Sequence, residues 1–279
     1  MPRYRSYAKI NLYLDITGVR GALHSLDMIM QSVSLYDELT FEPILDNKVE
    51  IICTQPGLCR NNIIESAFLK TQQAFPQIRH GFRVILNKKI PMGAGLAGGS
   101  GNAAATVHYL LNYHRIKISP PNLRALLLSI GSDVVFCYRG GTRRVRGVGD
   151  ELHSIKTPHR HVLVVNPRIA VNTAEAYRLW DAFSIGGTRV DSPPRDLSLP
   201  FNAFESVIFP LYPEIASLKS KLIEIGATVA LMSGSGSTVF GVFDTKALCD
   251  QAANRLDRKL YDVWVTRTIS TGISCLERQ

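Results

Sequence analysis

The sequence has few of the features that mark secreted, zinc-binding or membrane-spanning proteins. Its five cysteines are odd in number and none is paired as Cys-x-x-Cys, so neither a disulfide framework nor a zinc site is predicted. No signal peptide follows Met1, and no apolar run approaches the length that spans a membrane. We therefore expect a protein of the reducing cytoplasm.

Acidic residues are also missing from one long stretch, Gly99 to Ser132. The stretch follows a glycine-rich segment, Pro91 to Asn102, whose glycines fit Gly-x-Gly-x-x-Gly. A dinucleotide-binding loop needs an acidic residue about twenty positions later, and none is present. A Walker loop needs Gly-Lys-Ser/Thr, and a protein-kinase loop needs a later His-Arg-Asp; the sequence has neither. These three nucleotide-binding classes are therefore excluded.

The glycine-rich segment itself predicts a phosphate site of another type. It has five glycines in twelve positions, between the alternating strand Phe82 to Leu86 and the helix-forming run Ala103 to Ala105. Glycine allows positive φ and close approach of the backbone to a ligand, and the helix that follows directs its free N–H groups at the loop. A simple tight turn is the alternative, but it requires fewer glycines.

The composition indicates an ordinary globular protein with room for two domains, since 46% of residues are hydrophobic and 20% are charged. The net charge of +9 suits either a nucleic-acid partner or small anionic ligands. The densest basic cluster, Arg139 to Arg146, contains two glycines and little aromatic interleaving. It favours a solvated strand or the rim of an anion site, so we expect no nucleic-acid partner.

Hydrophobic periodicity and capping signals predict an α+β fold with a break near Thr157 to His161. The first half is expected to contain strands at 7–14, 26–35, 38–42, 48–53, 82–86, 132–138, 141–146 and 151–155, and helices at 62–74, 101–113 and 119–131. The second half is expected to contain strands at 162–166 and 263–267, helices at 174–183, 213–225 and 246–259, a hairpin at 227–243, and a mobile loop at 184–200. Its order is that of a β-α-β-β-α-β unit.

Three polar positions stand out on these elements. Lys9 and Asn11 share one face of the first strand, which spacing alone assigns to solvent. Asp133 begins an apolar strand, where an aspartate is either a turn residue or a carboxylate held for proton transfer. His24 lies at a strand start, and a lone histidine there is more often structural than catalytic.

Three separated stretches resemble the GHMP small-molecule kinases: Ala8 to Leu12, Pro91 to Ala104, and Met232 to Gly236. A fourth, Gly131 to Val135, resembles the family's Gly-Ala-Asp-Val-Pro. The resemblance implies an N-terminal ATP-binding domain with a left-handed βαβ unit (1–156) and a ferredoxin-like C-terminal domain (157–279). It also implies ATP-dependent phosphorylation of a cytidine-diphosphate-linked sugar alcohol, with ATP and Mg²⁺ as cofactors.

The resemblance assigns roles to residues by position. It implies that Asp133 and Lys9 are catalytic, that Ser100 faces the metal, and that Asn11, His24 and Tyr177 bind the substrate, Tyr177 by stacking on the cytosine ring. It assigns nucleotide binding to Asn62, Lys88, Pro91, Met92, Gly93, Ala94, Gly95, Leu96, Ala97, Gly98, Gly99, Ser100 and Gly101.

The sequence departs from the family pattern at several of these places. Leu23 stands where the family has an aromatic residue that sandwiches the cytosine, and loss of a base–aromatic stack costs roughly 1–3 kcal/mol in nucleic-acid systems. Ala97 and Gly101 replace a glycine and a serine, and Val135 replaces a proline. Two alternatives therefore stay open: a GHMP-type kinase for another small alcohol, and a non-catalytic RNA-binding module. We expect a monomer or weak homodimer.

Overall fold

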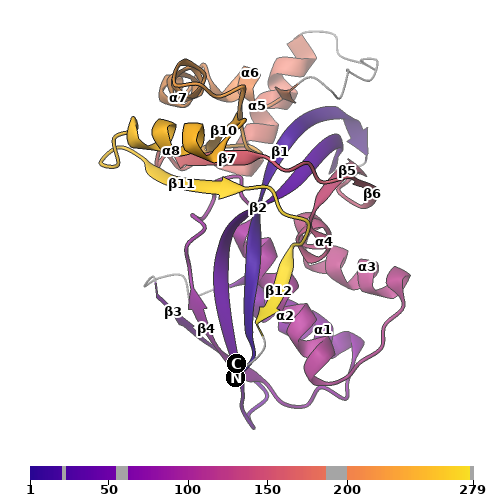
Figure 1. Cartoon of the computed structure of the whole chain (residues 1–279). Helices are drawn as coiled ribbons and strands as arrows, with labels where there is room; N and C mark the ends of the chain where they lie inside the picture. The colour runs from indigo at the N-terminus through magenta and orange to yellow at the C-terminus, as the bar shows by residue number, and fades with distance from the viewer. Residues whose placement is uncertain (21–22, 55–61, 187–199, 277–279) are drawn as a thin grey trace.

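Two β-sheets, each with helices packed on it, make up the protein (Figure 1). The structure is a computed structural model that describes residues 1–20, 23–54, 62–186 and 200–276. The loop predicted at 184–200 lies mostly outside these residues. The mixture of sheets and helices confirms the predicted α+β class.

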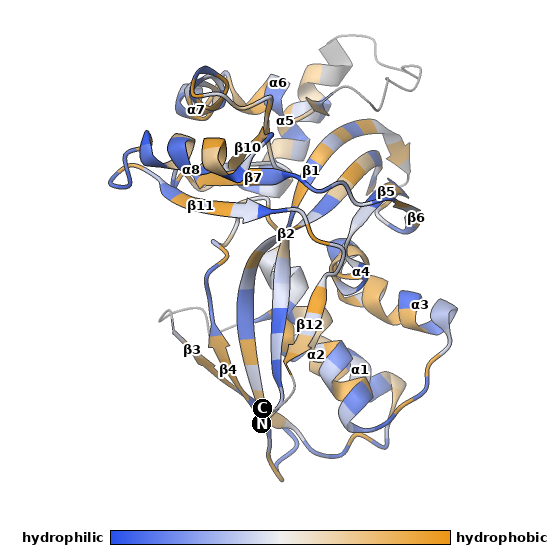
Figure 2. Ribbon diagram, in the orientation of Figure 1, coloured by the Kyte–Doolittle hydropathy of each residue, from blue (hydrophilic) through white to orange (hydrophobic). Residues whose placement is uncertain are grey.

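The first sheet is eight-stranded and is built on two long antiparallel strands, β1 and β2. Its path is β12-β1-β2-β4-β3, while β5 pairs with β2 and β6, and β8 pairs with β1. Hydrophobic and hydrophilic residues alternate along β1 and β2, as half-buried strands require (Figure 2). The strands are β1 (Arg3–Arg20), β2 (Leu23–Pro43), β3 (Val49–Cys53), β4 (Phe82–Asn87), β5 (Thr142–Gly147), β6 (Glu151–Ile155), β8 (Phe201–Asn202) and β12 (Ile273–Leu276).

Four helices accompany this sheet: α1 (Ile63–Ala74), α2 (Gly98–Tyr113), α3 (Pro120–Ile130) and α4 (Ser132–Arg139). Asn62 caps α1 by accepting a hydrogen bond from the N–H of Ile64 at 3.1 Å, and Ser119 caps α3. Strands β3 and β4 are parallel and joined through α1, which supplies a βαβ unit in this half.

The prediction of a strand at Ser132 to Tyr138 was wrong, because these residues form helix α4. The β-branched pair Val134–Val135 favours a strand locally. In the fold, four consecutive residues, Val134 to Cys137, are buried, since the short helix packs against α2, α3 and β1 on different sides. Tertiary packing therefore overrides the local preference.

The predicted strands at 26–35 and 38–42 form a single strand, β2. Asp37 lies between them and is fully buried, where its carboxylate accepts hydrogen bonds from the N–H groups of Lys89 and Ile90 and pairs with Lys88. These partners let an aspartate continue the strand where the sequence alone suggested a break.

The second sheet is four-stranded, antiparallel and ordered β11-β7-β10-β9. With α5 after the first of its strands and α8 before the last, this is the strand order of a ferredoxin-like β-α-β-β-α-β unit, as expected. The strands are β7 (His161–Asn166), β9 (Val229–Met232), β10 (Val239–Phe243) and β11 (Asp262–Arg267). The helices are α5 (Thr173–Gly186), α6 (Glu205–Ile208), α7 (Pro213–Glu224) and α8 (Lys246–Asn254).

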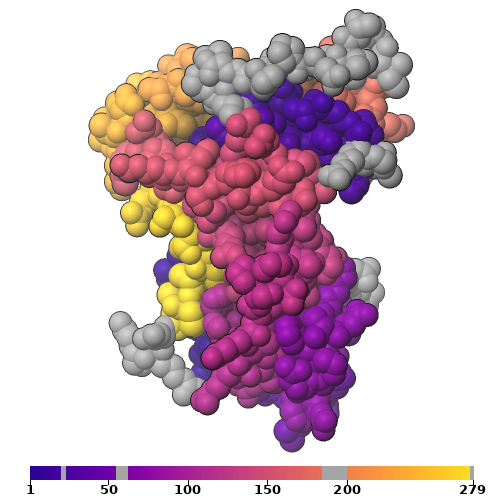
Figure 3. All heavy atoms as spheres, turned by 90° about the vertical axis from the view of Figure 1, so that its right-hand side faces the viewer, coloured from indigo at the N-terminus to yellow at the C-terminus, as the bar shows by residue number. Residues whose placement is uncertain are grey.

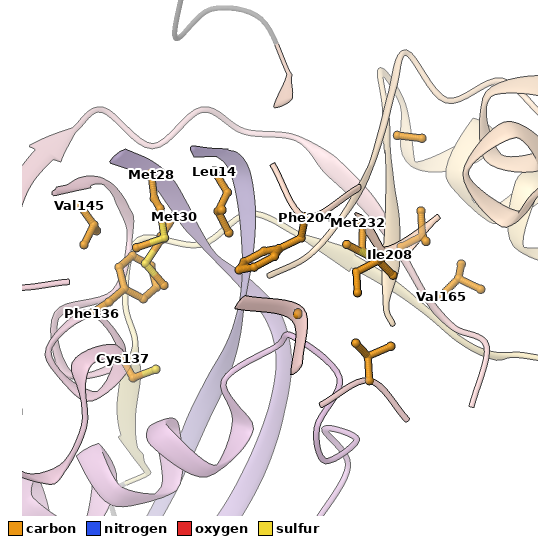
Figure 4. Close-up of a cluster of buried hydrophobic side chains, with 14 of the residues drawn as sticks. Leu14, Met28, Met30, Phe136, Cys137, Val145, Val165, Phe204, Ile208 and Met232 are labelled. Atoms are coloured by element: carbon orange, nitrogen blue, oxygen red, sulfur yellow. The ribbon is translucent and has the colours of Figure 1, made fainter. Parts of the chain in front are cut away.

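One hydrophobic core joins the two halves. Leu14, Met28 and Phe136 of the first half belong to the same buried cluster as Phe204 and Met232 of the second (Figure 4). Figure 3 shows the N-terminal residues, coloured indigo, lying against segments that follow residue 160. Since β8 and β12 both pair with β1, the chain after residue 157 contributes to both sheets. The boundary at residues 156 and 157 stays a prediction.

The core of the first half can be tested at Phe82 in β4, which is 0% exposed and packs its ring on Phe41, Phe68 and Tyr109. We expect Phe82→Ala to lower the free energy of unfolding by about 3–5 kcal/mol. Ile85, in the same strand but 43% exposed, is the matched control, and Ile85→Ala should cost less than about 1 kcal/mol. Urea denaturation followed by circular dichroism measures both, and equal losses would contradict this packing.

Candidate active site

The glycine-rich segment forms a loop that leads directly into α2. The helix begins at Gly98, three residues before the predicted start, and its N-cap Ala97 has a left-handed backbone with φ of 55°. The alanine has no side chain that can cap the helix, so the N–H groups of Gly98, Gly99 and Ser100 have no partner within α2. These groups, at the positive end of the helix, favour an anion.

A cavity of about 590 Å³ opens at this loop, between the two halves of the chain. Its wall includes Asp133, Asn62 and Lys88 from the first half, and Thr173, Tyr177, Phe204, Gly234 and Ser235 from the second. Of the predicted site residues, it also contains Lys9, Asn11, Pro91, Met92, Gly93, Ala94, Gly95, Ala97, Gly98, Gly99 and Ser100.

Three predicted residues do not line the cavity: Leu96, Gly101 and His24. Leu96 is buried, and its carbonyl accepts a hydrogen bond from the N–H of Lys9 at 3.1 Å. A Cβ at Gly101 would meet Ser6 at 3.4 Å, so a side chain at this position would face β1. Gly101 therefore supports the packing of α2 on the sheet.

Lys9 and Asn11 are buried, at 5% and 0% exposure, so the assignment of their face to solvent was wrong. Lys9 Nζ donates a hydrogen bond to Asn11 Oδ1 at 2.7 Å and lies 3.9 Å from Asp133 Oδ2. The reason for the error is that helix α4 and the Ser-Gly turn after β9 (Ser233 to Ser237) cover this face of β1, through Asp133 and Gly234, which periodicity within one strand cannot reveal.

Asp133 lies in the first turn of α4, with its side chain 37% exposed to the cavity. A carboxylate at this end of a helix is favoured by the helix dipole. The ammonium of Lys9 stands beside it. The arrangement provides an accessible acceptor for a proton next to a fixed positive charge, and the glycine loop borders the same cavity.

Two glycine turns from opposite halves meet at the cavity. A Cβ at Gly95 would lie 1.9 Å from Ser233 O, so only glycine fits there. Ser233 Oγ donates to Gly95 O at 2.9 Å, and the N–H of Gly234 donates to Asn11 Oδ1 at 3.1 Å. The Ser-Gly turn after β9 thus forms one wall of the site.

Lys88 is buried behind the loop and forms an ion pair with Asp37. A Cβ at Gly98 would meet Lys88 Nζ at 2.8 Å, so the ammonium lies directly under the first turn of α2. Asp37 also accepts hydrogen bonds from the N–H groups of Lys89 and Ile90, which fixes the chain at the start of the loop. This buried pair therefore supports the loop from below.

Aromatic residues gather at the other end of the cavity. Tyr177 and His24 are stacked with their ring centroids 4.4 Å apart, and His24 Nε2 is hydrogen-bonded to Asp181 Oδ1 at 2.7 Å. Burial and the nearby charge of Asp133 raise the pKa of Tyr177 to about 12, so its hydroxyl is neutral at pH 7. Leu23, at the position of the family's aromatic residue, is 60% exposed.

Several residues of the cavity wall were missed from the sequence. Phe204 follows the two-residue strand β8 and packs edge-on against Tyr177, and Gly149 lies in the β5–β6 turn against Ser132. The hydroxyls of Thr173 and Ser235 share a hydrogen bond at 2.8 Å. Ser235 lies in the stretch Met232 to Gly236 that resembles the family, but Phe204, Gly149 and Thr173 carry no local signal for a site, because each reaches the cavity only through tertiary packing.

No cluster of three or more His, Cys, Asp or Glu side chains suited to a metal ion occurs among the described residues. Ser100 and Asp133, whose oxygens suit a hard cation, line the same cavity.

In the described part of the chain, no helix has the length and apolar character needed to cross a membrane.

Comparison with known proteins identifies the family and the fold. The models of the GHMP kinases N-terminal domain and C-terminal domain match residues 62–141 and 195–262. The fold is also that of a homoserine kinase from Cytophaga hutchinsonii, with a TM-score of 0.72 at 17% identity over 99% of this chain and 97% of the other. Fold and site together define a two-domain small-molecule kinase of the GHMP type.

More similar relatives narrow the family. The 4-diphosphocytidyl-2-C-methyl-D-erythritol kinase of Thermoanaerobacter pseudethanolicus is 32% identical over 99% of both chains. The enzyme of that name from Pelotomaculum thermopropionicum is 37% identical over 94% of this chain and 96% of its own. A crystal structure of 4-(cytidine 5'-diphospho)-2C-methyl-D-erythritol kinase superposes with a TM-score of 0.82 at 28% identity, covering 95% of this chain and 98% of the other. The chain belongs to the 4-diphosphocytidyl-2-C-methyl-D-erythritol kinase family.

The contact between the two glycine turns can be tested with a matched pair of substitutions. Gly93 and Gly95 both have positive φ, at 59° and 73°, but no heavy atom of the described residues comes within 4 Å of a Cβ built at Gly93. Gly93→Ala should cost only the roughly 1–2 kcal/mol of a left-handed alanine. Gly95→Ala must also displace the Ser233 carbonyl, and we expect it to lower the melting temperature further and weaken ATP binding at least tenfold. Calorimetry measures both, and equal effects of the two substitutions would contradict the contact.

Proposed function

We propose that this protein transfers the γ-phosphoryl group of ATP to the 2-hydroxyl of 4-diphosphocytidyl-2-C-methyl-D-erythritol, in non-mevalonate isoprenoid precursor biosynthesis. The observation that carries the proposal is the pair Lys9 and Asp133, 3.9 Å apart, in the cavity that the glycine loop borders. The full-length similarity to kinases of that name supports the choice of acceptor.

The phosphates of ATP are proposed to bind at the glycine loop. The free N–H groups of Gly98 to Ser100 and the positive end of α2 supply donors for phosphate oxygens. Lys88, buried under the same turn, supports the loop through its ion pair with Asp37. Asn62 and Met92 line the cavity beside the loop, where they are proposed to contact the rest of the nucleotide.

Asp133 is proposed to take or orient the proton of the acceptor hydroxyl. Its carboxylate is accessible from the cavity, and the ammonium of Lys9 keeps a positive charge beside it as negative charge builds on the transferring group. Asn11 holds that ammonium by accepting its hydrogen bond. Positioning and electrostatic stabilisation are what phosphoryl transfer requires of a protein.

Mg²⁺ is proposed to accompany ATP. It commonly binds through one or two protein ligands together with substrate phosphates, which suits a cavity lined by the hydroxyl of Ser100. The ion would neutralise charge on the phosphates.

The acceptor is proposed to bind at the aromatic end of the cavity. Tyr177 offers a ring face for stacking and a neutral hydroxyl as a hydrogen-bond donor, and His24 lies stacked against it. A second candidate, a kinase of the same type acting on another small alcohol, is favoured by one observation: Leu23 is exposed and non-aromatic. We keep the expectations of a monomer or weak homodimer, a cytoplasmic location and no nucleic-acid partner.

Phosphoryl transfer is tested by single-turnover kinetics with ATP, Mg²⁺ and 4-diphosphocytidyl-2-C-methyl-D-erythritol, with phosphorus NMR to locate the new phosphate. We expect transfer to the 2-hydroxyl, reduced about 10²- to 10⁴-fold in Asp133→Asn because the proton acceptor is lost. Asp46→Asn, at an exposed aspartate away from the cavity, serves as the control. A wild-type protein that binds ATP but transfers nothing would favour another alcohol.

The RNA-binding alternative makes a different prediction. Lys9 and Asp133 lie inside a cavity, where an RNA-binding surface would not need them together. The double variant Lys9→Ala with Asp133→Asn should therefore abolish phosphoryl transfer and leave any RNA affinity unchanged in a filter-binding assay. Retained transfer in this variant would refute the kinase assignment of the pair.

A further inference from the structure

Asn202 is a buried polar residue outside the cavity, and both the Nδ2 and the Oδ1 atoms of its side chain form hydrogen bonds. It is 2% exposed and lies in β8. Its Nδ2 donates to Met232 O at 2.7 Å and to Gly234 O at 2.8 Å, while its Oδ1 accepts from the N–H of Phe204 at 3.0 Å. The Asn202 amide thus binds two carbonyl groups at the start of the Ser-Gly turn, those of Met232 and Gly234.

That turn is in direct contact with the catalytic lysine. The N–H of Gly234 donates to Asn11 Oδ1, the same oxygen that accepts the hydrogen bond of Lys9 Nζ. A Cβ built at Gly234 would lie 3.4 Å from Lys9 Nζ. A continuous series of hydrogen bonds therefore runs from Asn202 through Gly234 and Asn11 to the ammonium beside Asp133.

The segment of Asn202 is also fixed to the strand that carries Lys9 and Asn11. Asn202 pairs with Leu14 in the parallel β8–β1 ladder, and the N–H of Ala203 donates to Leu14 O at 2.9 Å. Glu205, three residues later, accepts a hydrogen bond from the N–H of Met232 at 2.9 Å. Asn202 therefore bridges β1 of the first half and the Ser-Gly turn of the second.

We infer that Asn202 is a positioning residue for Lys9, acting through the Ser-Gly turn and Asn11. Its two donated hydrogen bonds, to the carbonyls of Met232 and Gly234, fix the start of the Ser-Gly turn. The N–H of Gly234 then fixes the side chain of Asn11, which accepts the hydrogen bond of the Lys9 ammonium. A displacement of about 1 Å in such a group can reduce the rate about 100-fold. The kinetic part of this inference rests on the proposed function; the structural part does not.

The test uses an isosteric substitution. Asn202→Asp keeps the shape and the acceptor for Phe204 but replaces the Nδ2 donor with an oxygen that faces two carbonyls. Asn166 is a matched control, since it is also buried in the same half, donates to Thr238 Oγ1 and accepts from the N–H of Arg168. Within the described part of the chain, its side chain forms no hydrogen bond to residues 232–234. Asn202→Ala and Asn166→Ala form a second pair, without the charge, for use if Asn202→Asp fails to fold.

The first two measurements need no substrate. In ¹⁵N NMR spectra we expect the buried Lys9 ammonium signal to shift or broaden, and hydrogen exchange at the Gly234 amide to accelerate at least tenfold. Both changes should appear in the Asn202 variants and not in the Asn166 variants. Unchanged Lys9 and Gly234 signals in a folded Asn202 variant would overturn the inference.

The kinetic measurement separates this inference from the proposed function. We expect kcat of the Asn202 variants to fall about 10- to 100-fold, with a smaller change in the KM for ATP, while the Asn166 variants keep the wild-type kcat. An inactive wild type would refute the proposed function, and the NMR result would still decide the inference. An active wild type whose Asn202 and Asn166 variants lose activity equally would refute the inference alone.

Discussion

The close approach of two glycine turns is the constraint on which the site depends. Gly95 of the first half and Ser233 of the second touch at a distance that no side chain at position 95 allows. The contact brings the Gly234 backbone to Asn11 and closes the cavity over Lys9. Because the glycine loop and the Ser-Gly turn come from different halves, the site exists only when the two halves are docked. The shared core of Leu14, Phe204 and Met232 stabilises that docking.

Two buried lysines at this docking surface have different surroundings. Lys88 is paired with Asp37, which is itself fully buried and accepts hydrogen bonds from backbone N–H groups. The two charges therefore neutralise each other inside the protein, and the pair supports the glycine loop. Lys9 is equally buried but stands beside an aspartate that opens to the cavity. Burying a charge is costly unless it is paired and hydrogen-bonded. A buried ammonium whose acidic partner stays accessible is therefore an arrangement suited to chemistry on a ligand.

Much of the fold could be predicted because its signals are local. The caps at Asn62 and Ser119, the alternation in β1 and the order of strands and helices along the second half all follow from short-range patterns. What failed depends on distant parts of the chain. Helix α4 forms because neighbours bury it on several sides, and Lys9 is buried because α4 and the Ser-Gly turn, both more than a hundred residues later, cover its face. Tertiary packing also brings β8 to β1 and Phe204 to Tyr177, which no periodicity within one element encodes.

A double-mutant cycle on Lys9→Met and Asp133→Asn, read by single-turnover phosphoryl transfer, tests whether these two residues act as one catalytic pair. Residues that act as one unit are strongly non-additive, so we expect the double variant to be hardly slower than the slower single variant. Binding of ATP, measured in parallel, shows that each variant is folded. Losses that simply multiply would mean that Lys9 and Asp133 act independently, and would contradict the shared site described above.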